Sequence, residues 1–284
     1  MAVLSAEDRA FFEKNGYVVV RGAVPVEDCE AVVDAVFDFL GMDPNDPEDW
    51  YRPPHRPNGM VELYQHPALW KNRQNPRIYG AMVDLYQNEK LWVSIDRANF
   101  KPPPHPDHPE YDQKGFTHWD VDTTTVHQPL RVQGVLYLRD TTEDMGGFTC
   151  VPGFIGPVLE KWIAEQPADR DPRRPDLSRL PEGCSVQPIP GKAGDFVIWS
   201  TLLAHGNGHN TSGKPRFAQY IAMSPAREND EAARADRIMR WRERLAPDAS
   251  WVYGDERGWE QKNCQTAELT PLGRKLLGLD RWED

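Results

Sequence analysis

Strand-like segments follow one another through the middle of this 284-residue chain, and few helical segments separate them. These segments are rich in β-branched and aromatic residues, and they occupy residues 91–100, 131–138, 195–200 and 217–223. A doubly wound parallel sheet needs a helix after nearly every strand. The pattern therefore predicts a mainly β chain whose strands form an antiparallel sandwich or jelly roll.

Helical segments are expected at both ends of the chain. Ser5 can cap a short helix over residues 6–14. Pro25 can open a second helix that continues to about Leu40, because apolar residues recur there at helical spacing. We expect a single domain over residues 1–284. It should have N-terminal helices over about 5–45 and a jelly-roll core over about 91–223, with an inserted proline-rich loop at 165–190. C-terminal helices should follow over about 226–284.

Composition and charge argue against several classes of protein. The net charge of −11 would repel nucleic-acid phosphates. No stretch reaches the roughly 18 apolar residues of a membrane helix, and the first residues lack the basic and apolar regions of a signal peptide. The four cysteines have no C-x-x-C spacing, which disfavours a zinc site or a disulfide framework. We expect a cytoplasmic protein that binds neither nucleic acid nor membrane, and the sequence carries no signal for an oligomeric state.

A His-x-Asp triplet is the strongest chemical signal in the chain. His118 and Asp120 are two residues apart, so their side chains share one face of a strand. His205 follows Asp120 by 85 residues, next to a strand-like apolar run. Two imidazoles and one carboxylate on one face of a metal are the ligand set of non-haem Fe(II) oxygenases. The sequence therefore predicts a metal centre at His118, Asp120 and His205.

Arg216 lies eleven residues after His205, and the segment between them is dense in turn-forming residues. We expect a hairpin that places Arg216 beside His205, deeper in the barrel. There a guanidinium could bind a carboxylate through two parallel hydrogen bonds. The alternative for this arginine is a surface charge at a hairpin.

Other histidines could compete for the metal. His105-Pro106-Asp107 repeats the triplet, but its proline and proline neighbours exclude it from a central strand, so we expect a solvated loop. His209 lies within the turn, where we expect solvent exposure, and His205 is favoured. For His118 and Asp120 themselves, the alternative is a buried hydrogen-bonded pair without a metal.

Taken together, these motifs resemble those of the phytanoyl-CoA dioxygenase-like (PhyH) family of Fe(II)/2-oxoglutarate oxygenases. The resemblance runs through most of the chain and rests on segments that agree in order and spacing. They are Phe11–Gly22, the His118 and Asp120 pair, Gly146–Gly153, Gly194–Trp199, His205–Ser212 and Arg216.

The resemblance implies a double-stranded β-helix, the cupin-like jelly roll, with helices packed outside. It also implies that His118, Asp120 and His205 hold Fe(II). Arg216 would pair with the distal carboxylate of 2-oxoglutarate, and dioxygen would be the other reactant. Further residues expected to line the cosubstrate pocket are Asn207, Gln133 and Thr149.

The implied reaction is hydroxylation of an unactivated C–H bond, with release of succinate and carbon dioxide. Asp120 favours it, because halogenating relatives have a small residue at this position. Desaturation, epimerisation and cyclisation are alternative outcomes at the same site. A cupin-type metal enzyme that does not use 2-oxoglutarate and a binding module without catalysis are further alternatives. Arg216 disfavours the first of these, and the intact ligand set disfavours the second.

The expected substrate is a small molecule. Phe116 and Trp119 could form an apolar wall, whereas Arg97 and Lys101 could bind an anionic group. Ordinary packing and solvation are the alternative for all four side chains. A small metabolite is favoured over an acyl-coenzyme A, although the arginines between residues 170 and 179 keep the latter open.

Overall fold

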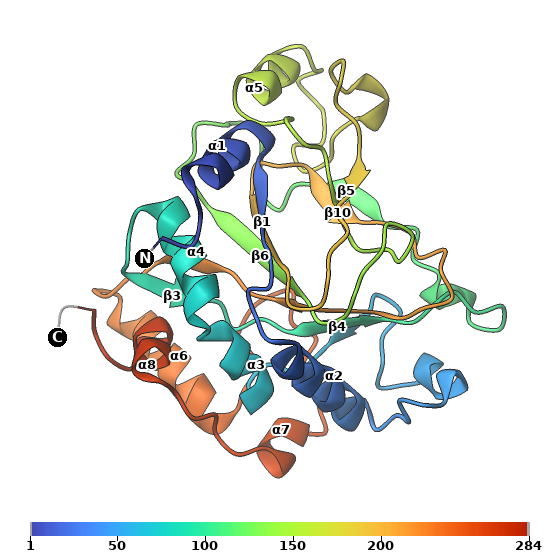
Figure 1. Ribbon diagram of the computed structural model, residues 1–284, viewed down its shortest axis with the longest axis vertical. Coiled ribbons are helices and arrows are strands. Elements are labelled where there is room, and N and C mark those ends of the chain that lie inside the picture. Colours follow the sequence, from blue (N-terminus) through green and yellow to red (C-terminus); the bar gives the residue numbers. More distant parts are fainter. Residues whose placement is uncertain (1, 283–284) are drawn as a thin grey trace.

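Two antiparallel sheets form the centre of the computed structural model, which describes residues 2–282 (Figure 1). The larger sheet has the order β1-β9-β6-β11-β4-β2, and the smaller has the order β5-β10-β7-β8. The strands of the larger sheet, given in this same order, are Tyr17–Val20, Phe196–Ser200, Val132–Tyr137, Arg216–Tyr220, Ala98–Lys101 and Met60–Val61. The smaller comprises Phe116–His118, His205–Asn207, Phe148–Cys150 and Gln187–Pro188. A separate pair joins β12 (Met223–Pro225) to β3 (Leu91–Val93).

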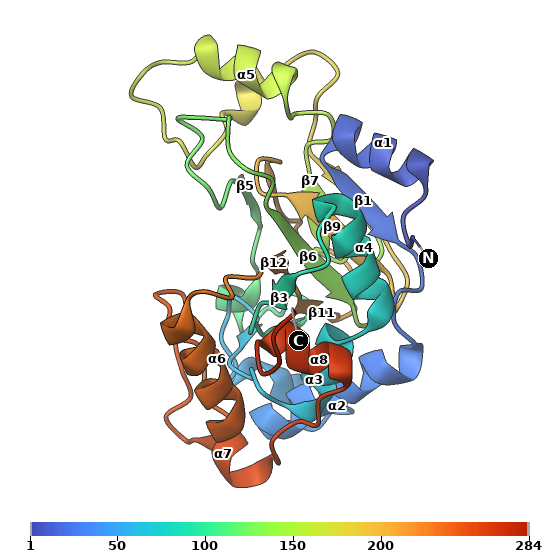
Figure 2. The same cartoon turned by 90° about the vertical axis from the view of Figure 1, so that its left-hand side faces the viewer.

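Helices flank the sheets, as the sequence predicted. They are α1 (Ala6–Asn15), α2 (Val26–Leu40), α3 (Pro67–Arg73), α4 (Pro76–Tyr86), α5 (Pro157–Ala164), α6 (Glu231–Glu243), α7 (Trp259–Asn263) and α8 (Pro271–Leu277). Figure 2 shows α2, α3, α6, α7 and α8 gathered at one end of the molecule and α5 at the other. No helix within residues 2–282 combines the length and the apolar character needed to cross a membrane.

Local sequence explains the N-terminal helices. Ser5 and Asp8 form the two reciprocal hydrogen bonds of a capping box at the start of α1, as predicted. In α2 the apolar stripe predicted from helical spacing is buried. This stripe packs on the outer face of the larger sheet, where Phe37 contacts the rings of Phe100 and Phe217.

Alternation along the strands separates the outer core from the space between the sheets. Phe196 and Ile198 of β9 belong to the outer core with α2, whereas Val197 and Trp199 belong to an inner cluster with Phe148 of the smaller sheet. The centre of the molecule is thus bounded by one face of each sheet.

Two expectations about topology need correction. The turn after His205 does not form a hairpin, because β10 pairs with β5 and β7 whereas β11 pairs with β4 and β6. Helices α3, α4 and α5 were also missed, each of which begins at a proline. The segment 165–190, which we expected to be an inserted loop, ends in β8, which pairs with β7.

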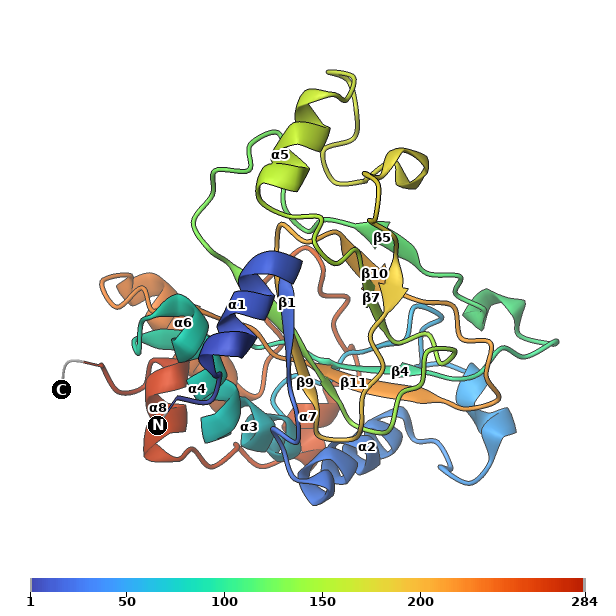
Figure 3. The same ribbon diagram turned by 45° about the horizontal axis from the view of Figure 1, so that its top comes forward.

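Gly206 allows β10 to lie between its two neighbours, seen side by side in Figure 3. A Cβ atom at this position would lie 1.9 Å from the carbonyl oxygen of Phe116 in β5. No real side chain tolerates that distance. Gly206 is therefore required for the pairing of β10 with β5.

We expect Gly206→Ala to lower the free energy of unfolding by about 1–3 kcal/mol, because the new methyl group must push β5 away. Gly213→Ala is the matched control, since a Cβ atom at Gly213 would meet nothing within 4 Å. Urea denaturation of the two variants and the parent protein measures the difference. Equal stability of the two variants would show that β10 does not need a glycine here.

Candidate metal centre and adjoining cavity

Adjacent strands bring the three predicted metal ligands together. His205 of β10 lies directly opposite His118 of β5 in the register of the smaller sheet, and Asp120 follows two residues after His118. One potential ligand atom from each of the three residues lies within 4.8 Å of the others. The Nε2 atom of His118 lies 3.2 Å from one carboxylate oxygen of Asp120, and the Nε2 atom of His205 lies 3.4 Å from the other. This is the spacing of groups that can converge on one metal ion.

Neighbouring groups orient the ligands. The Nδ1 atom of His205 lies 2.9 Å from the carbonyl oxygen of Leu203, so its Nε2 atom points to the cluster. Gln133 donates a hydrogen bond of 2.7 Å from Nε2 to Asp120. The exposed fraction of the His205 side chain is 6%, whereas that of Asp120 is 43%. The cluster is therefore anchored on one side and open on the other.

Asp120 is held in its ionised form. Burial alone would raise its pKa, but hydrogen bonds with His118, His205 and Gln133 and the charge of His205 outweigh burial. The pKa of this carboxyl group is accordingly well below its usual range. A permanently ionised carboxylate beside two imidazoles is suited to binding a divalent cation.

A cavity of about 730 Å³ adjoins the three ligands. His118, Asp120 and His205 are part of its wall, and so are Trp199 and Phe148, which pack against the His205 ring. The ring centroids of Trp199 and His205 are 5.0 Å apart. Apolar rings thus shield the inner side of the cluster from water.

Two cations face one another at a buried part of this wall. Arg216 begins β11, as predicted, and lies opposite Lys101 of β4. Arg216 is completely buried and donates one hydrogen bond, to Asn99, while its Nε and Nη2 atoms have no partner within residues 2–282. Burial, together with the charge of Arg216, lowers the pKa of Lys101 to about 8. Neither cation forms an ion pair with a described residue, so this part of the cavity is suited to an anion.

Three of the predicted site residues do not serve as expected. Trp119 is buried against Phe154 and Trp162, on the side of the strand away from His118. Thr149 lies outside the cavity wall, because its neighbour Phe148 occupies the inward position of β7. Arg97 does reach the wall, but its charge is already paired with Glu62.

The other predicted residues lie on the cavity wall. These are Asn207, Gln133, Phe116 and Lys101. Sequence reasoning missed Trp199, although the alternation of residues 195–200 could have placed it on the inner face. It also missed Trp251, which reaches the wall from the loop between α6 and α7, where no local pattern marks it.

The rival histidines have other partners. His209 lies 2.5 Å from Asp112, and the Nε2 atom of His105 in the proline-rich loop lies 3.3 Å from a carboxylate oxygen of Glu48. Within the described part of the chain, His118, Asp120 and His205 are the single group with metal-ligand spacing. The preference for His205 over His209 agrees with this geometry.

Comparison with known proteins places the chain in a family. A Dictyostelium discoideum protein named "Putative phytanoyl-CoA dioxygenase" is 26% identical over 263 residues, with 76% of this chain and 74% of that protein covered. Among solved structures, the epimerase SnoN in complex with Fe3+, alpha ketoglutarate and nogalamycin RO has a TM-score of 0.55 at 17% identity, covering 78% of this chain and 83% of that one. The alpha ketoglutarate dependent carbocyclase SnoK has a TM-score of 0.52 at 20% identity, covering 81% and 90%.

These structures share the fold, and the sequence match defines the family. The family model described as phytanoyl-CoA dioxygenase (PhyH) matches residues 12–218, which include the three ligands and Arg216. The chain therefore belongs to the phytanoyl-CoA dioxygenase (PhyH) family.

Proposed function

We propose that this protein is an Fe(II)- and 2-oxoglutarate-dependent dioxygenase that hydroxylates a C–H bond of a small molecule, and that its two facing sheets are a double-stranded β-helix. One observation carries the proposal. A group of two histidines and one aspartate shares a cavity with a buried arginine that has no counter-ion among the residues the structure describes.

The donor set fits iron. His118, Asp120 and His205 supply two imidazoles and one carboxylate, which leaves coordination positions for a cosubstrate and dioxygen. When bound there, iron and 2-oxoglutarate would supply the oxidising power, with succinate and carbon dioxide as products. The hydrogen bond from Gln133 and the contact with the Leu203 carbonyl would hold the ligands in place.

The buried cations fit the distal carboxylate of 2-oxoglutarate. Two guanidinium nitrogens of Arg216 have no partner in the described part of the chain, and a carboxylate can accept hydrogen bonds from both. Lys101 adds a second positive charge in the same low-dielectric environment. Lys101 would therefore act with Arg216 at the cosubstrate end of the cavity, and not at the substrate end.

Epimerisation and cyclisation remain second candidates, since SnoN and SnoK are named as an epimerase and a carbocyclase. Desaturation would use the same site. A cupin-type metal enzyme without 2-oxoglutarate is less well supported, because it would leave the two buried cations without a ligand.

Arg216→Met tests the cosubstrate assignment. In calorimetric titration of the Mn(II)-loaded protein, we expect 2-oxoglutarate to bind at least 30-fold more weakly, because a buried charge pair is worth about 2–5 kcal/mol. Mn(II) affinity should not change. Succinate formation by the aerobic Fe(II) protein should fall in parallel.

Arg139→Met is the matched control, because Arg139 pairs with Glu30 on the outer side of the larger sheet. It should bind 2-oxoglutarate like the parent protein. Unchanged binding in Arg216→Met would contradict the cosubstrate assignment, and the cupin-type alternative would then be favoured.

Lys101→Met tests the electrostatic cost of the cation pair. The pKa of Lys101 is about 8 in the folded protein, whereas its ordinary value is 10.5. Between pH 8 and pH 10.5 the unfolded chain therefore binds more protons than the folded protein. Removal of this charge should raise the unfolding free energy of the metal-free protein at pH 7 by about 2–3 kcal/mol.

The stability that Lys101→Met gains over the parent protein should shrink as pH rises from 8 to 10.5, because Lys101 of the parent loses its proton in the folded state. Urea denaturation of both proteins at pH 7, 8.5 and 10 measures the difference in unfolding free energy. A difference between the two proteins that does not depend on pH would show that the lysine charge carries no such cost.

A further inference from the structure

A segment outside the family match covers part of the cavity. The loop between α6 and α7 includes residues 248–254, which we call the strap, whereas the family model ends at residue 218 (Figure 2). Trp251 of the strap lies on the cavity wall, and 43% of its surface is exposed. The strap therefore adds an aromatic side chain from outside the family match to a cavity that also carries the family motifs.

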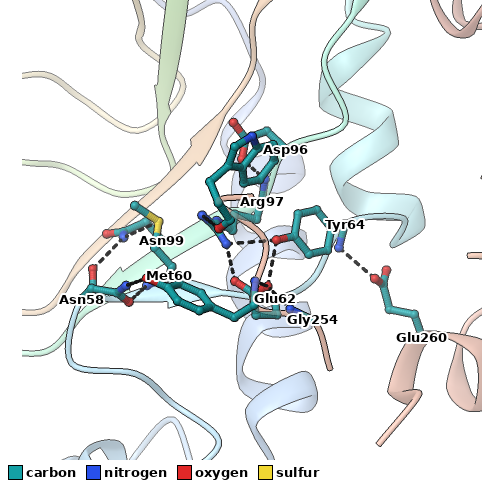
Figure 4. A network of polar contacts seen from close by, with 11 residues as sticks. Asn58, Met60, Glu62, Tyr64, Asp96, Arg97, Asn99, Gly254 and Glu260 are labelled. Atoms are coloured by element: carbon teal, nitrogen blue, oxygen red, sulfur yellow. Dashed lines mark hydrogen bonds and ion pairs between the residues drawn. The ribbon is translucent and has the colours of Figure 1, made fainter. Parts of the chain in front are cut away.

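A buried ion pair fastens the strap (Figure 4). Glu62 accepts hydrogen bonds of 3.0 and 2.8 Å from the backbone amides of Tyr253 and Gly254. Arg97, which pairs with Glu62, donates a hydrogen bond of 3.1 Å to the carbonyl oxygen of Trp251. The exposed fractions of the Arg97 and Glu62 side chains are 7% and 6%. The pair therefore holds the strap at residues 251–254, and the charge of Arg97 is already neutralised by Glu62.

Two aromatic rings of the wall carry a cation on one face. The guanidinium carbon of Arg97 lies 4.9 Å from the ring centroid of Trp251, and that of Arg174 lies 5.4 Å from the ring of Phe116. Phe116 is 58% exposed, although it lies on the cavity wall. Both rings thus offer apolar surface that a ligand could remove from water.

Charge differs between the ends of the cavity. Of the cations on the wall, Arg216 and Lys101 form no ion pair with any residue from 2 to 282. Near the strap, Arg97 is neutralised by Glu62, and Asp96 also lies on the wall. The strap end therefore offers an anionic group no unpaired cation among residues 2–282, whereas an uncharged ring needs none.

We infer that Trp251 is a specificity-determining residue that stacks on a flat, uncharged ring of the substrate, and that the Glu62–Arg97 pair positions it. This inference rests on the proposed function, because it takes the cavity next to the metal ligands as the substrate site. It assigns the substrate to small molecules with a planar unsaturated ring system. It also gives Arg97 a positioning role instead of a role in binding an anion.

Binding of 2-naphthol and trans-2-decalol to the metal-free protein tests the inference, because the two probes have similar size but only one is flat. Ligand-observed NMR titration should give at least ten-fold tighter binding of 2-naphthol. Trp251→Ala should weaken 2-naphthol binding about ten-fold and leave 2-decalol unchanged. Trp251→Phe should keep most of the affinity.

Ser250→Ala is the control on the same strap, since Ser250 is exposed and lies outside the cavity wall. It should bind 2-naphthol like the parent protein. Glu62→Gln should speed hydrogen exchange at the amides of Tyr253 and Gly254 and weaken 2-naphthol binding. Equal binding of the two probes, or full affinity in Trp251→Ala, would overturn the inference.

The readout does not depend on iron. Loss of 2-naphthol selectivity with normal succinate formation would reject the role of Trp251 and leave the oxygenase proposal intact. Selective binding of 2-naphthol without any succinate formation would reject the oxygenase proposal. The inference that Trp251 binds a planar ring would then still hold.

Discussion

The pairing of β10 with β5 is the constraint on which the site depends. His118 and His205 are far apart in sequence, and the register of this pair sets them opposite one another. A slip by one residue would turn one of the imidazoles to the other face of the sheet. Gly206 makes the close approach possible, because a side chain there would meet the backbone of β5. The geometry of the candidate metal centre is therefore fixed by backbone pairing before any metal binds.

Charge is distributed along the cavity in a way that suits two different ligands. Arg216 and Lys101 place two positive charges in a buried position where no counter-ion comes from residues 2–282, which costs stability in the free protein. Near the strap, Glu62 neutralises Arg97, and Trp251 lies on the cavity wall with 43% of its surface exposed. An anionic cosubstrate and an uncharged ring would thus be bound at opposite ends, with the metal ligands on the wall they share.

Much of the candidate site could be predicted from local sequence patterns. The His-x-Asp spacing, the apolar run before His205 and the start of a strand at Arg216 all agree with the structure. The misplacement of Trp119 was avoidable, because the alternation that puts His118 and Asp120 on one face puts the residue between them on the other. The prediction for Thr149 is wrong because of the same alternation. Thr149 lies between Phe148 and Cys150 of the inner cluster, so its side chain is on the other face of β7.

Other features depend on contacts that no local pattern encodes. Arg97 and its partner Glu62 are separated by 35 residues, and the strap that they hold comes from a loop more than 150 residues further along the chain. The turn after His205 has the composition of a hairpin, but the strands on its two sides belong to different sheets. Such pairings are decided by the packing of the whole molecule.

The most direct test of the central claim is an anaerobic titration. Metal-free protein receives Fe(II) and then 2-oxoglutarate, and its visible absorption spectrum is recorded. The account predicts a metal-to-ligand charge-transfer band that saturates at one equivalent of each and is absent in His118→Ala. Iron binding without such a band at saturating 2-oxoglutarate would contradict it.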